Sequence, residues 1–296
     1  MGKAHYRHWH NTGTIGCFGA AAAAAEALHL DRRQFAHALA TVTTFAAGLQ
    51  QAFRMDSMSK PLHAGRAAEA GVAAALMARE GVTGSLDVMQ GFAAAMGDKP
   101  RFDDSVDKGL ATLGKDFHIT RMTFKNHACC GHTFAAIDGA LELKKRMNLK
   151  PEDIEQIEVA TYKAGVEVAG YEKPTTPAEG RFSLKYVVAT ALTHGSVRLA
   201  AFEPRRLNDS ATARVMQKIS LSVDPQLEAE FPGKRQARVA IRARGKREEF
   251  LQPTRIGDPE APLSDRMLEE KYYELVTPVL GEAKARQELA RLWQLT

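Results

Sequence analysis

Three short segments concentrate lysine and histidine beside glycine, proline and threonine: H-W-H-N-T-G at 8–13, S-K-P-L-H-A-G at 59–65 and F-K-N-H-A-C-C-G-H at 124–132. Glycine lets a backbone approach a ligand closely, and the start of a helix attracts negative charge. Cations gathered at such places favour the binding of an anion. The sequence therefore predicts a pocket for a small polycarboxylate, assembled from segments that are far apart in the chain.

The first two segments also have ordinary structural explanations. In the first, either Asn11 or Thr12 caps a helix and the histidines lie on the surface, or His10 is a carboxylate ligand or proton donor. In the second, Lys60 is either a solvated lysine beside a capping turn or a cation that adds its charge to the helix dipole. A lone Lys–His pair lacks the spacing of a metal site, so we expect no metal here.

The third segment leaves a predicted strand and enters a predicted helix. One interpretation is a nucleophilic cysteine–histidine pair drawn from Cys129, Cys130, His127 and His132. In the other, Lys125 binds an anion while the cysteines pack as small apolar side chains. We favour the second interpretation because no third orienting group follows at a recognisable spacing.

The elements that position these segments begin with an alanine-rich region from 13 to 100, in which apolar residues recur at helical spacing. The predicted helices are 13–29, 31–48, 63–80 and 84–94. Asp31 is the expected cap of the second helix, and Thr83 or Ser85 that of the fourth. The close spacing that alanine permits predicts a packed helical bundle, and a turn follows at 98–105.

After this turn the sequence pattern changes and predicts a mixture of strands and helices. The predicted strands are 119–125, 154–162, 218–223 and 236–243, and the predicted helices are 132–147 and 181–195. The second helix ends at Gly195 and carries Arg181, Lys185 and Tyr186 on an otherwise apolar pattern. Tyr186 is either a buried side chain seeking a hydrogen bond or a donor to the substrate.

A helical pattern returns near the end of the chain, with Ser264 as the N-cap, Met267, Leu268, Tyr272 and Leu275 facing inward, and a second helix near 281–294. This order predicts a mainly α fold with an α+β part. A discontinuous all-helical domain (1–115 and 251–296) carries an α+β lid domain (116–250). Clefts between such domains are favoured sites for small ligands.

Composition narrows the classes of protein further. The net charge of +5 peaks in the basic run 235–247, but these charges alternate as on a strand and no aromatic-interleaved module accompanies them, so we expect no nucleic-acid partner. Three cysteines, two of them adjacent, fit a reducing, cytoplasmic compartment and are too few for an iron–sulfur cluster. We expect no membrane span. The apolar run at 15–28 is interrupted by Glu26 and fits a packed helix better than a signal peptide.

Five ordered motifs resemble a known family: H-W-H-N-T-G-T-I-G-C-F-G-A-A-A-A-A (8–24), M-D-S-M-S-K-P-L-H-A-G (55–65), F-K-N-H-A-C-C-G-H-T-F-A-A-I-D (124–138), F-S-L-K-Y-V-V-A-T-A-L (182–192) and G-D-P-E-A-P-L-S-D (257–265). Together they resemble the MmgE/PrpD family, which includes 2-methylcitrate dehydratase, cis-aconitate decarboxylase and iminodisuccinate epimerase. The resemblance runs over nearly the whole chain. It does not select one activity.

The resemblance implies a helical domain with an α+β lid, homodimerisation through the helical domain, and a metal-independent active site without a cofactor in the cleft between them. By motif position, the counterparts of the family's active-site residues are His10, Lys60, Lys125 and Tyr186. Around them we expect substrate-binding residues at Thr12, His63, His127, His132 and Arg181.

Two departures from the family's pattern bear on activity. Decarboxylase members carry a histidine five positions after the third-motif lysine, where this chain has Cys130, so decarboxylation is not the favoured reaction. Family chains are also normally longer, with a preceding Asp-rich motif, and D-D-S at 103–105 lies in the wrong order to replace it. We therefore expect this sequence to correspond to the C-terminal two-thirds of a family member, with the missing part on a separate chain, a misassigned start, or a degenerate remnant.

The leading hypothesis from the sequence is a lyase that eliminates water from a hydroxylated di- or tricarboxylate, as 2-methylcitrate dehydratase does. Lys60 and Lys125 hold carboxylates, His10 acts as acid or base, and Tyr186 donates a hydrogen bond or relays a proton. The alternatives are an epimerase, isomerase or decarboxylase acting on a related acid, and a non-catalytic subunit that binds the acid or a longer partner.

Overall fold

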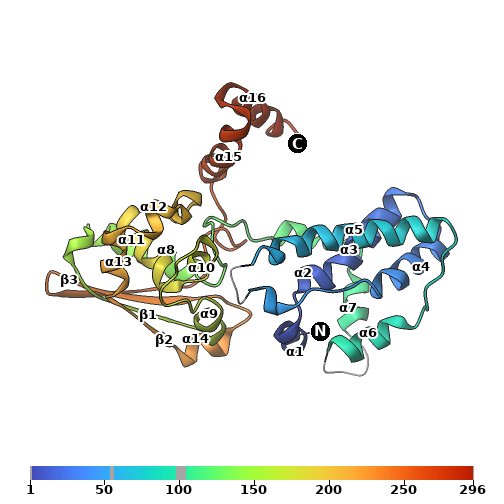
Figure 1. Ribbon diagram of the computed structural model, residues 1–296, viewed down its shortest axis with the longest axis horizontal. Coiled ribbons are helices and arrows are strands. Elements are labelled where there is room, and N and C mark those ends of the chain that lie inside the picture. Colours follow the sequence, from blue (N-terminus) through green and yellow to red (C-terminus); the bar gives the residue numbers. More distant parts are fainter. Residues whose placement is uncertain (1, 54–56, 98–104, 296) are drawn as a thin grey trace. The chain divides into compact units, whose positions relative to one another are not determined.

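The computed structural model describes residues 2–53, 57–97 and 105–295 (Figure 1). The chain divides into two compact units, 1–116 and 117–296, and each is described by itself. The turn predicted at 98–105 falls almost entirely outside the described residues, as do Met55 and Asp56 of the second motif. Among the described helices, none is long and apolar enough to cross a bilayer.

Unit 1 is helical. Its elements are α1 (Gly2–His8), α2 (Asn11–Thr14), α3 (Gly16–Ala27), α4 (Arg32–Thr43), the 3-10 helix η1 (Gln50–Phe53), α5 (Ser59–Arg79), α6 (Val88–Met96) and α7 (Ser105–Ala111). Alanine lines the contact between α3 and α5, which therefore pack at close range. A Cβ added at Gly71 of α5 would lie 2.5 Å from the backbone nitrogen of Ala21 in α3. The predicted packed bundle of alanine-rich helices is confirmed.

The predicted helix starts of unit 1 are partly right. Asp31 caps α4: its carboxylate accepts from the Gln34 backbone N–H at 2.8 Å, and the Gln34 side chain accepts in return at 3.1 Å. Helix α5 begins at Ser59, four residues earlier than predicted, because a proline in the first turn costs no hydrogen bond. The prediction of Thr83 or Ser85 as a cap is wrong. Asp87 precedes α6 instead, and the Ser85 hydroxyl donates to the Asp87 carboxylate at 2.5 Å.

Unit 2 is α+β. Its strands are β1 (Ile154–Thr161), β2 (Ile219–Val223), β3 (Ala237–Ala243) and β4 (Lys246–Gln252). Its helices are η2 (His118–Arg121), α8 (Phe134–Arg146), η3 (Pro151–Asp153), α9 (Lys163–Val168), α10 (Pro177–Arg181), α11 (Leu184–His194), η4 (Leu199–Phe202), α12 (Pro204–Leu207), α13 (Ser210–Met216), α14 (Pro225–Glu230), α15 (Asp265–Leu280) and α16 (Glu282–Leu292). The expectation of a mainly α chain with an α+β part is confirmed.

The four strands form one mixed sheet in the order β2-β1-β3-β4, in which β1 and β2 are parallel and the other pairs antiparallel. Helices α8, α11 and α13 lie on one side of it, the upper side in Figure 1. The core between them includes Ile157, Val188, Val239 and Ile241, all fully buried. Inward-facing apolar residues alternate with outward-facing polar ones, as an antiparallel sheet with one covered face requires.

The basic run 235–247 lies mostly on β3, β4 and their turn, and its Arg238, Arg244 and Arg247 form ion pairs. On the outer face, Arg238 contacts Asp224 and Glu249 at 3.3 and 3.1 Å. Arg247 contacts Glu158 and Glu249 at 2.9 and 3.1 Å. The excess positive charge of the sequence is therefore partly neutralised here by carboxylates on neighbouring elements. The expected absence of a nucleic-acid partner stays a prediction.

One predicted strand and one predicted helix of unit 2 are wrong. Residues 119–125 alternate in sequence, but Ile119 and Phe124 are 71% and 51% exposed, and the segment forms η2 and a loop. The fourth strand is β4, which its charged residues concealed. The helix predicted at 181–195 is two helices: α10 ends at Arg181, and Ser183 caps α11, so Arg181 and Tyr186 lie on different helices. Gly195 ends α11 with φ +79°, as predicted.

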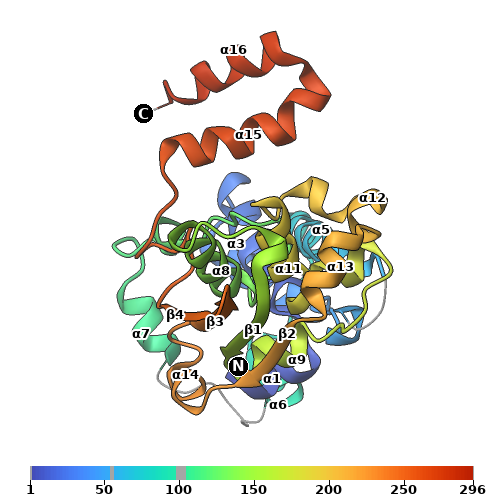
Figure 2. The same cartoon turned by 90° about the vertical axis from the view of Figure 1, so that its left-hand side faces the viewer.

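Helices α15 and α16 form a hairpin (Figure 2). Ser264 caps α15, accepting from Met267 N–H at 3.4 Å, as predicted. Leu275, expected to face inward, is 46% exposed within unit 2. The return of 251–296 to a discontinuous helical domain stays a prediction, as do the domain bounds 1–115 and 116–250.

Candidate active site

In unit 1, His10 lies between α1 and α2, where its backbone is held from both directions. Its N–H donates to the Gly48 carbonyl at 2.8 Å, and its carbonyl accepts from the N–H groups of Gly13 and Thr14. The backbone of Gly13 passes so close to the next loop that an added Cβ would lie 2.3 Å from the Ala47 carbonyl oxygen. A side chain at position 13 therefore cannot fit without moving this loop, which explains the glycine in the first motif.

The His10 side chain forms a hydrogen-bonded pair with His63 of α5, with Nδ1 to Nδ1 at 2.8 Å and ring centroids 5.1 Å apart. Burial, with smaller contributions from the nearby His63 and Lys60, lowers the pKa of His10 to about 4. His10 is therefore neutral at pH 7 in this structure. Lys60 and His63 are three residues apart in α5 and so share a face of the helix. The structure brings His10 and His63 into contact near Lys60, and their role in binding substrate stays a prediction.

The remaining unit 1 residue of the predicted site, Thr12, is exposed on α2. The sequence analysis missed its neighbour His5, which is fully buried. One ring nitrogen of His5 lies 2.8 Å from Thr14 Oγ1, and the other lies 2.7 Å from the Met96 carbonyl oxygen. Burial lowers the pKa of His5, which favours its neutral ring. His5 therefore fixes the helix that follows His10. The density of histidines before position 10 was the signal that could have found it.

In unit 2, Lys125 lies on the loop between η2 and α8, with its side chain exposed. The preceding residue donates its backbone N–H to the Gly257 carbonyl at 2.8 Å. Gly257 has φ +105°, and a Cβ there would lie 2.0 Å from the Phe124 carbonyl oxygen. The Lys125 carbonyl accepts from Lys271 Nζ of α15 at 2.9 Å. The loop that presents Lys125 is therefore fixed by the fifth motif and by the C-terminal hairpin.

A buried ion pair beside Gly257 secures the same loop. Arg255 forms a salt bridge with Asp258 at 2.5 Å and donates to Thr123 Oγ1 at 3.0 Å. Asp258 also accepts from Thr123 Oγ1 at 2.6 Å. Hydrogen bonds to Arg255 and Thr123 hold the pKa of Asp258 below its ordinary value despite burial. The sequence analysis quoted the fifth motif but assigned Asp258 no role, and Arg255 lies two residues before that motif.

His127 and His132 face different partners. His127 is buried and its Nε2 lies 2.9 Å from Asp138 Oδ1, while Asp138 Oδ2 accepts from the Ile256 N–H at 2.9 Å. His132 Nδ1 lies 2.8 Å from the Tyr162 hydroxyl. Both histidines were predicted to bind substrate. His127 instead connects two loops in this structure, and a role in substrate binding stays a prediction for both.

The cysteines and Arg181 complete the surroundings of the third motif. Burial raises the pKa of Cys129 to about 12, so its thiol stays protonated at neutral pH. This favours packing over nucleophilic chemistry. Cys130 is buried and donates its N–H to the Arg181 carbonyl at 3.0 Å. The Arg181 guanidinium lies 4.9 Å from the Phe202 ring centroid. Its predicted role in substrate binding stays a prediction.

Tyr186 is buried in a core cluster with Phe134 and Phe202, and its hydroxyl donates to the Ala201 carbonyl at 2.5 Å. Burial raises its pKa. The structural explanation weighed from the sequence, a buried tyrosine with a hydrogen-bond partner, is the one observed. A role as proton relay stays a prediction and requires this hydrogen bond to break.

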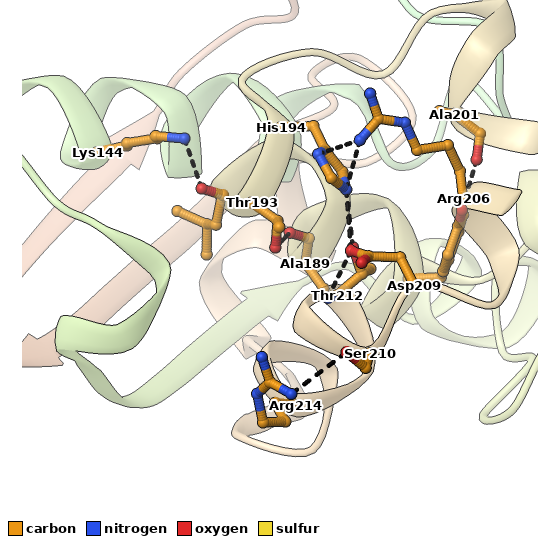
Figure 3. A network of polar contacts seen from close by, with 12 residues as sticks. Lys144, Ala189, Thr193, His194, Ala201, Arg206, Asp209, Ser210, Thr212 and Arg214 are labelled. Atoms are coloured by element: carbon orange, nitrogen blue, oxygen red, sulfur yellow. Dashed lines mark hydrogen bonds and ion pairs between the residues drawn. The ribbon is translucent and has the colours of Figure 1, made fainter.

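A polar network lies at the C-terminal end of α11 (Figure 3). His194 Nε2 lies 3.0 Å from Asp209 Oδ2, and Arg206 contacts the same ring. Asp209 caps α13 by accepting from Thr212 N–H at 2.9 Å, and its hydrogen bonds with Thr212 lower its pKa to about 2. The network joins α11, α12 and α13. The helix cap formed by Asp209 and its ion pair with His194 give these residues a structural role.

The predicted site residues thus fall into two groups, one in each unit. His10, Lys60 and His63 are together in unit 1, whereas Lys125 lies in unit 2. Within residues 2–53, 57–97 and 105–295, no three His, Cys, Asp or Glu side chains gather as a metal site requires. Chemistry without metal or cofactor stays a prediction.

Comparison with known families agrees with this division. Residues 1–105 match the MmgE/PrpD N-terminal domain, and residues 127–295 match the MmgE/PrpD C-terminal domain. The protein belongs to the MmgE/PrpD family, as the five ordered motifs indicated.

Similar curated proteins include the cis-aconitate decarboxylase-like protein oryM of Aspergillus oryzae, which is 27% identical over 72% of this chain and 47% of its own length. Human cis-aconitate decarboxylase is 26% identical over 74% of this chain and 46% of its own length. The mouse cis-aconitate decarboxylase is 27% identical over 74% and 45%. The chain therefore spans less than half the length of these relatives in the matched region.

Proposed function

We propose that this protein takes part in a lyase reaction on a small polycarboxylate, and that the reaction eliminates water from a hydroxylated di- or tricarboxylate as 2-methylcitrate dehydratase does. The observation that carries this proposal is the contact between His10 and His63, with Nδ1 to Nδ1 at 2.8 Å beside Lys60. Membership of the MmgE/PrpD family supports the substrate class.

The histidine pair is suited to an elimination because two rings joined through their Nδ1 atoms must play different roles, one as donor and one as acceptor. In the tautomers proposed for the reaction, the donor ring carries a lone pair on Nε2, while the ring that accepts at Nδ1 carries a proton on Nε2. The pair thus presents one base and one donor. The base removes the proton from the carbon next to a carboxylate, the donor protonates the departing hydroxyl, and a carbon–carbon double bond forms as water leaves.

Lysines supply the fixed charge that this reaction needs. Loss of a proton next to a carboxylate places a second negative charge on that carboxylate, and Lys60 and Lys125 would stabilise it. Bound substrate would also raise the pKa of His10 from about 4, because a nearby carboxylate favours the protonated ring. In this proposal His10 is the base, which requires that it donates its Nδ1–H to His63.

Decarboxylation of cis-aconitate is the second candidate, because the relatives described above carry that name. The residues around the third motif favour dehydration instead. Cys130, at the position of the decarboxylase histidine, is buried, His127 pairs with Asp138, and His132 contacts Tyr162.

The test is an assay of the purified 296-residue chain on 2-methylcitrate, citrate and cis-aconitate, following unsaturated-acid absorbance and released carbon dioxide. Absorbance gain without carbon dioxide supports dehydration, and carbon dioxide release supports the second candidate. Racemised acid without either product points to an epimerase, which chiral chromatography detects. Full turnover by Lys60→Ala on the true substrate would show that the lysine assignment is wrong.

A further inference from the structure

Three segments of unit 2 that are far apart in sequence converge at the Lys125 loop. The Lys125 carbonyl accepts from Lys271 Nζ at 2.9 Å, which joins the loop to α15. Three residues along the loop, the Ala128 N–H donates to the Val197 carbonyl at 3.0 Å. The 197–199 segment returns to α15, where Glu274 accepts from the Leu199 N–H at 2.9 Å. Each of these three segments, the Lys125 loop, residues 197–199 and α15, therefore contacts the other two.

This convergence gathers positive charge. Lys125, Arg198 and Lys271 lie close enough that the first two lower the pKa of Lys271, after burial, which is the largest cause. Glu274 is the carboxylate that offsets them, and its Oε2 is 3.9 Å from Arg198 NH1, beyond hydrogen-bond distance. The cluster of Lys125, Arg198, Lys271 and Glu274, here called the α15 cation cluster, is thus net positive.

We propose that the α15 cation cluster is a binding subsite for one carboxylate of a polycarboxylate, with Arg198 and Lys271 as ligands in addition to Lys125. The inference rests on the proposed function, since it specifies where a further carboxylate of that substrate binds. It predicts a preference for acids with more carboxylates, because each added carboxylate gains a charged partner.

The donor geometry supports an anion as the occupant. An ammonium has three N–H donors, of which Lys271 gives one to the Lys125 carbonyl. Arg198 is about a fifth exposed and faces Glu274 without a close contact. Holding like charges together is unfavourable, and a bound carboxylate relieves that repulsion with charge-assisted hydrogen bonds. The competing explanation is that Lys271 only ties α15 to the Lys125 loop.

The experiment measures binding by calorimetry to the full chain, with propane-1,2,3-tricarboxylate and glutarate as probes that do not react. Lys271→Met should weaken the tricarboxylate about tenfold, and Arg198→Gln by a similar factor, with smaller effects on the dicarboxylate. Lys271→Arg keeps the charge and should stay within about threefold of the parent. Lys284→Met removes an exposed lysine of the same hairpin and should change nothing.

Glu274→Gln separates binding from tethering. The amide oxygen still accepts from Leu199 N–H, so the contact between segments remains, but the offsetting charge is lost. A subsite predicts binding about threefold tighter, whereas a purely structural tether predicts no gain. Circular dichroism and the melting temperature of each variant monitor folding. If Lys271→Met unfolds, Lys271→Arg and Glu274→Gln decide the question.

The possible outcomes separate this inference from the proposed function. Equal tricarboxylate affinity in the parent, Lys271→Met and Arg198→Gln overturns the subsite, while turnover that depends on Lys60 and Lys125 leaves the lyase standing. Weakened binding in both variants without turnover of any acid supports the subsite and counts against the lyase. A parent chain that binds neither probe overturns the subsite.

Discussion

The two regions that carry the predicted site residues differ in the kind of side chain that each contains, titratable histidines in one and cations in the other. In unit 1, the His10 and His63 rings share a hydrogen bond, and burial lowers the pKa of His10 to about 4. In unit 2, Lys125, Arg198 and Lys271 are permanent cations beside a single described carboxylate partner, Glu274. The first region is equipped to move a proton, and the second to hold charge. The proposed lyase reaction calls for both properties.

The two regions nevertheless use one device to place their residues. Gly13 lies against the Ala47 carbonyl, and Gly257 against the Phe124 carbonyl, so that an added Cβ would be 2.3 and 2.0 Å away. Each glycine brings a loop carrying a site residue against a fixed backbone. The two regions therefore differ in chemistry but position their site residues in the same way.

The largest expected effect tests the proton-moving half. His10→Asn should lower kcat about a thousandfold with substrate binding largely retained, because a positioned acid or base contributes that much to proton transfer. Steady-state kinetics of the dehydration, with the hydroxylated acid as substrate, measure it. His8→Asn, a change to an exposed histidine in the same segment, is the control. A kcat within about tenfold of the parent would remove His10 from the proton-transfer role.

The next largest expected effect tests the cations of unit 2. Lys125→Met should lower kcat/KM about a hundredfold, with a larger share in KM than for His10→Asn, because a fixed cation also holds the ground-state acid. Comparison of kcat and KM for the two variants sharpens the contrast between the regions. Lys145→Met, at an exposed position on α8, should match the parent. Equal effects of the two variants on KM would break the division of labour.

The close approach of Gly257 to Phe124 leads to a prediction about stability, with an expected loss of about 2 kcal/mol in the free energy of unfolding. Gly257→Ala should destabilise the fold by this amount, since it adds a clash with Phe124 to the strain of φ +105°. Urea unfolding measures the loss. Gly245→Ala is matched in backbone strain, with φ +73° but open space around it, and should cost only about 1 kcal/mol. Equal losses would show that the close approach to Phe124 contributes nothing.

The smallest effect concerns pH. The folded pKa of His10, about 4, lies below the ordinary 6.5, so the unfolded chain binds a proton in this window that the folded chain does not. Stability from this source is complete above pH 6.5 and is lost as the pH falls toward 4. After solvent screening we expect about 1 kcal/mol. The loss of unfolding free energy between pH 7 and 4.5 should be smaller in His10→Asn than in His8→Asn, while the same loss in both would refute the shift.

Local chemical signals in the sequence predicted much of this structure. The N-cap at Asp31, the glycine ending α11 and the alternation in β1 and β3 each depend on neighbouring residues, and each was predicted. Strand β4 was missed because its outward charges pair with β3 and β1 rather than alternating with apolar residues. Residues 119–125 alternate without a partner strand, so their pattern was misleading.

The candidate site was predictable to the level of residue types but not of contacts. The motifs located His10 and His63, yet their direct hydrogen bond depends on how α5 packs on α2 and α3. Likewise, α15 showed no chemical motif, and only tertiary contacts reveal that Lys271 reaches the Lys125 carbonyl. Tyr186 looked equally suited to chemistry and to packing, and its partner Ala201 lies 15 residues away in another helix.

The close packing at Gly71 has a mechanical consequence for the histidine pair. His63 lies eight residues before Gly71 on the same helix, about 12 Å along its axis. A side chain at position 71 would wedge α5 from α3, and a tilt of about 5° about that contact would move His63 by about 1 Å. Helix α5 therefore carries a displacement at position 71 to His63. The residue at position 71 thus influences the distance between the His10 and His63 rings, although it lies two turns away and touches neither ring.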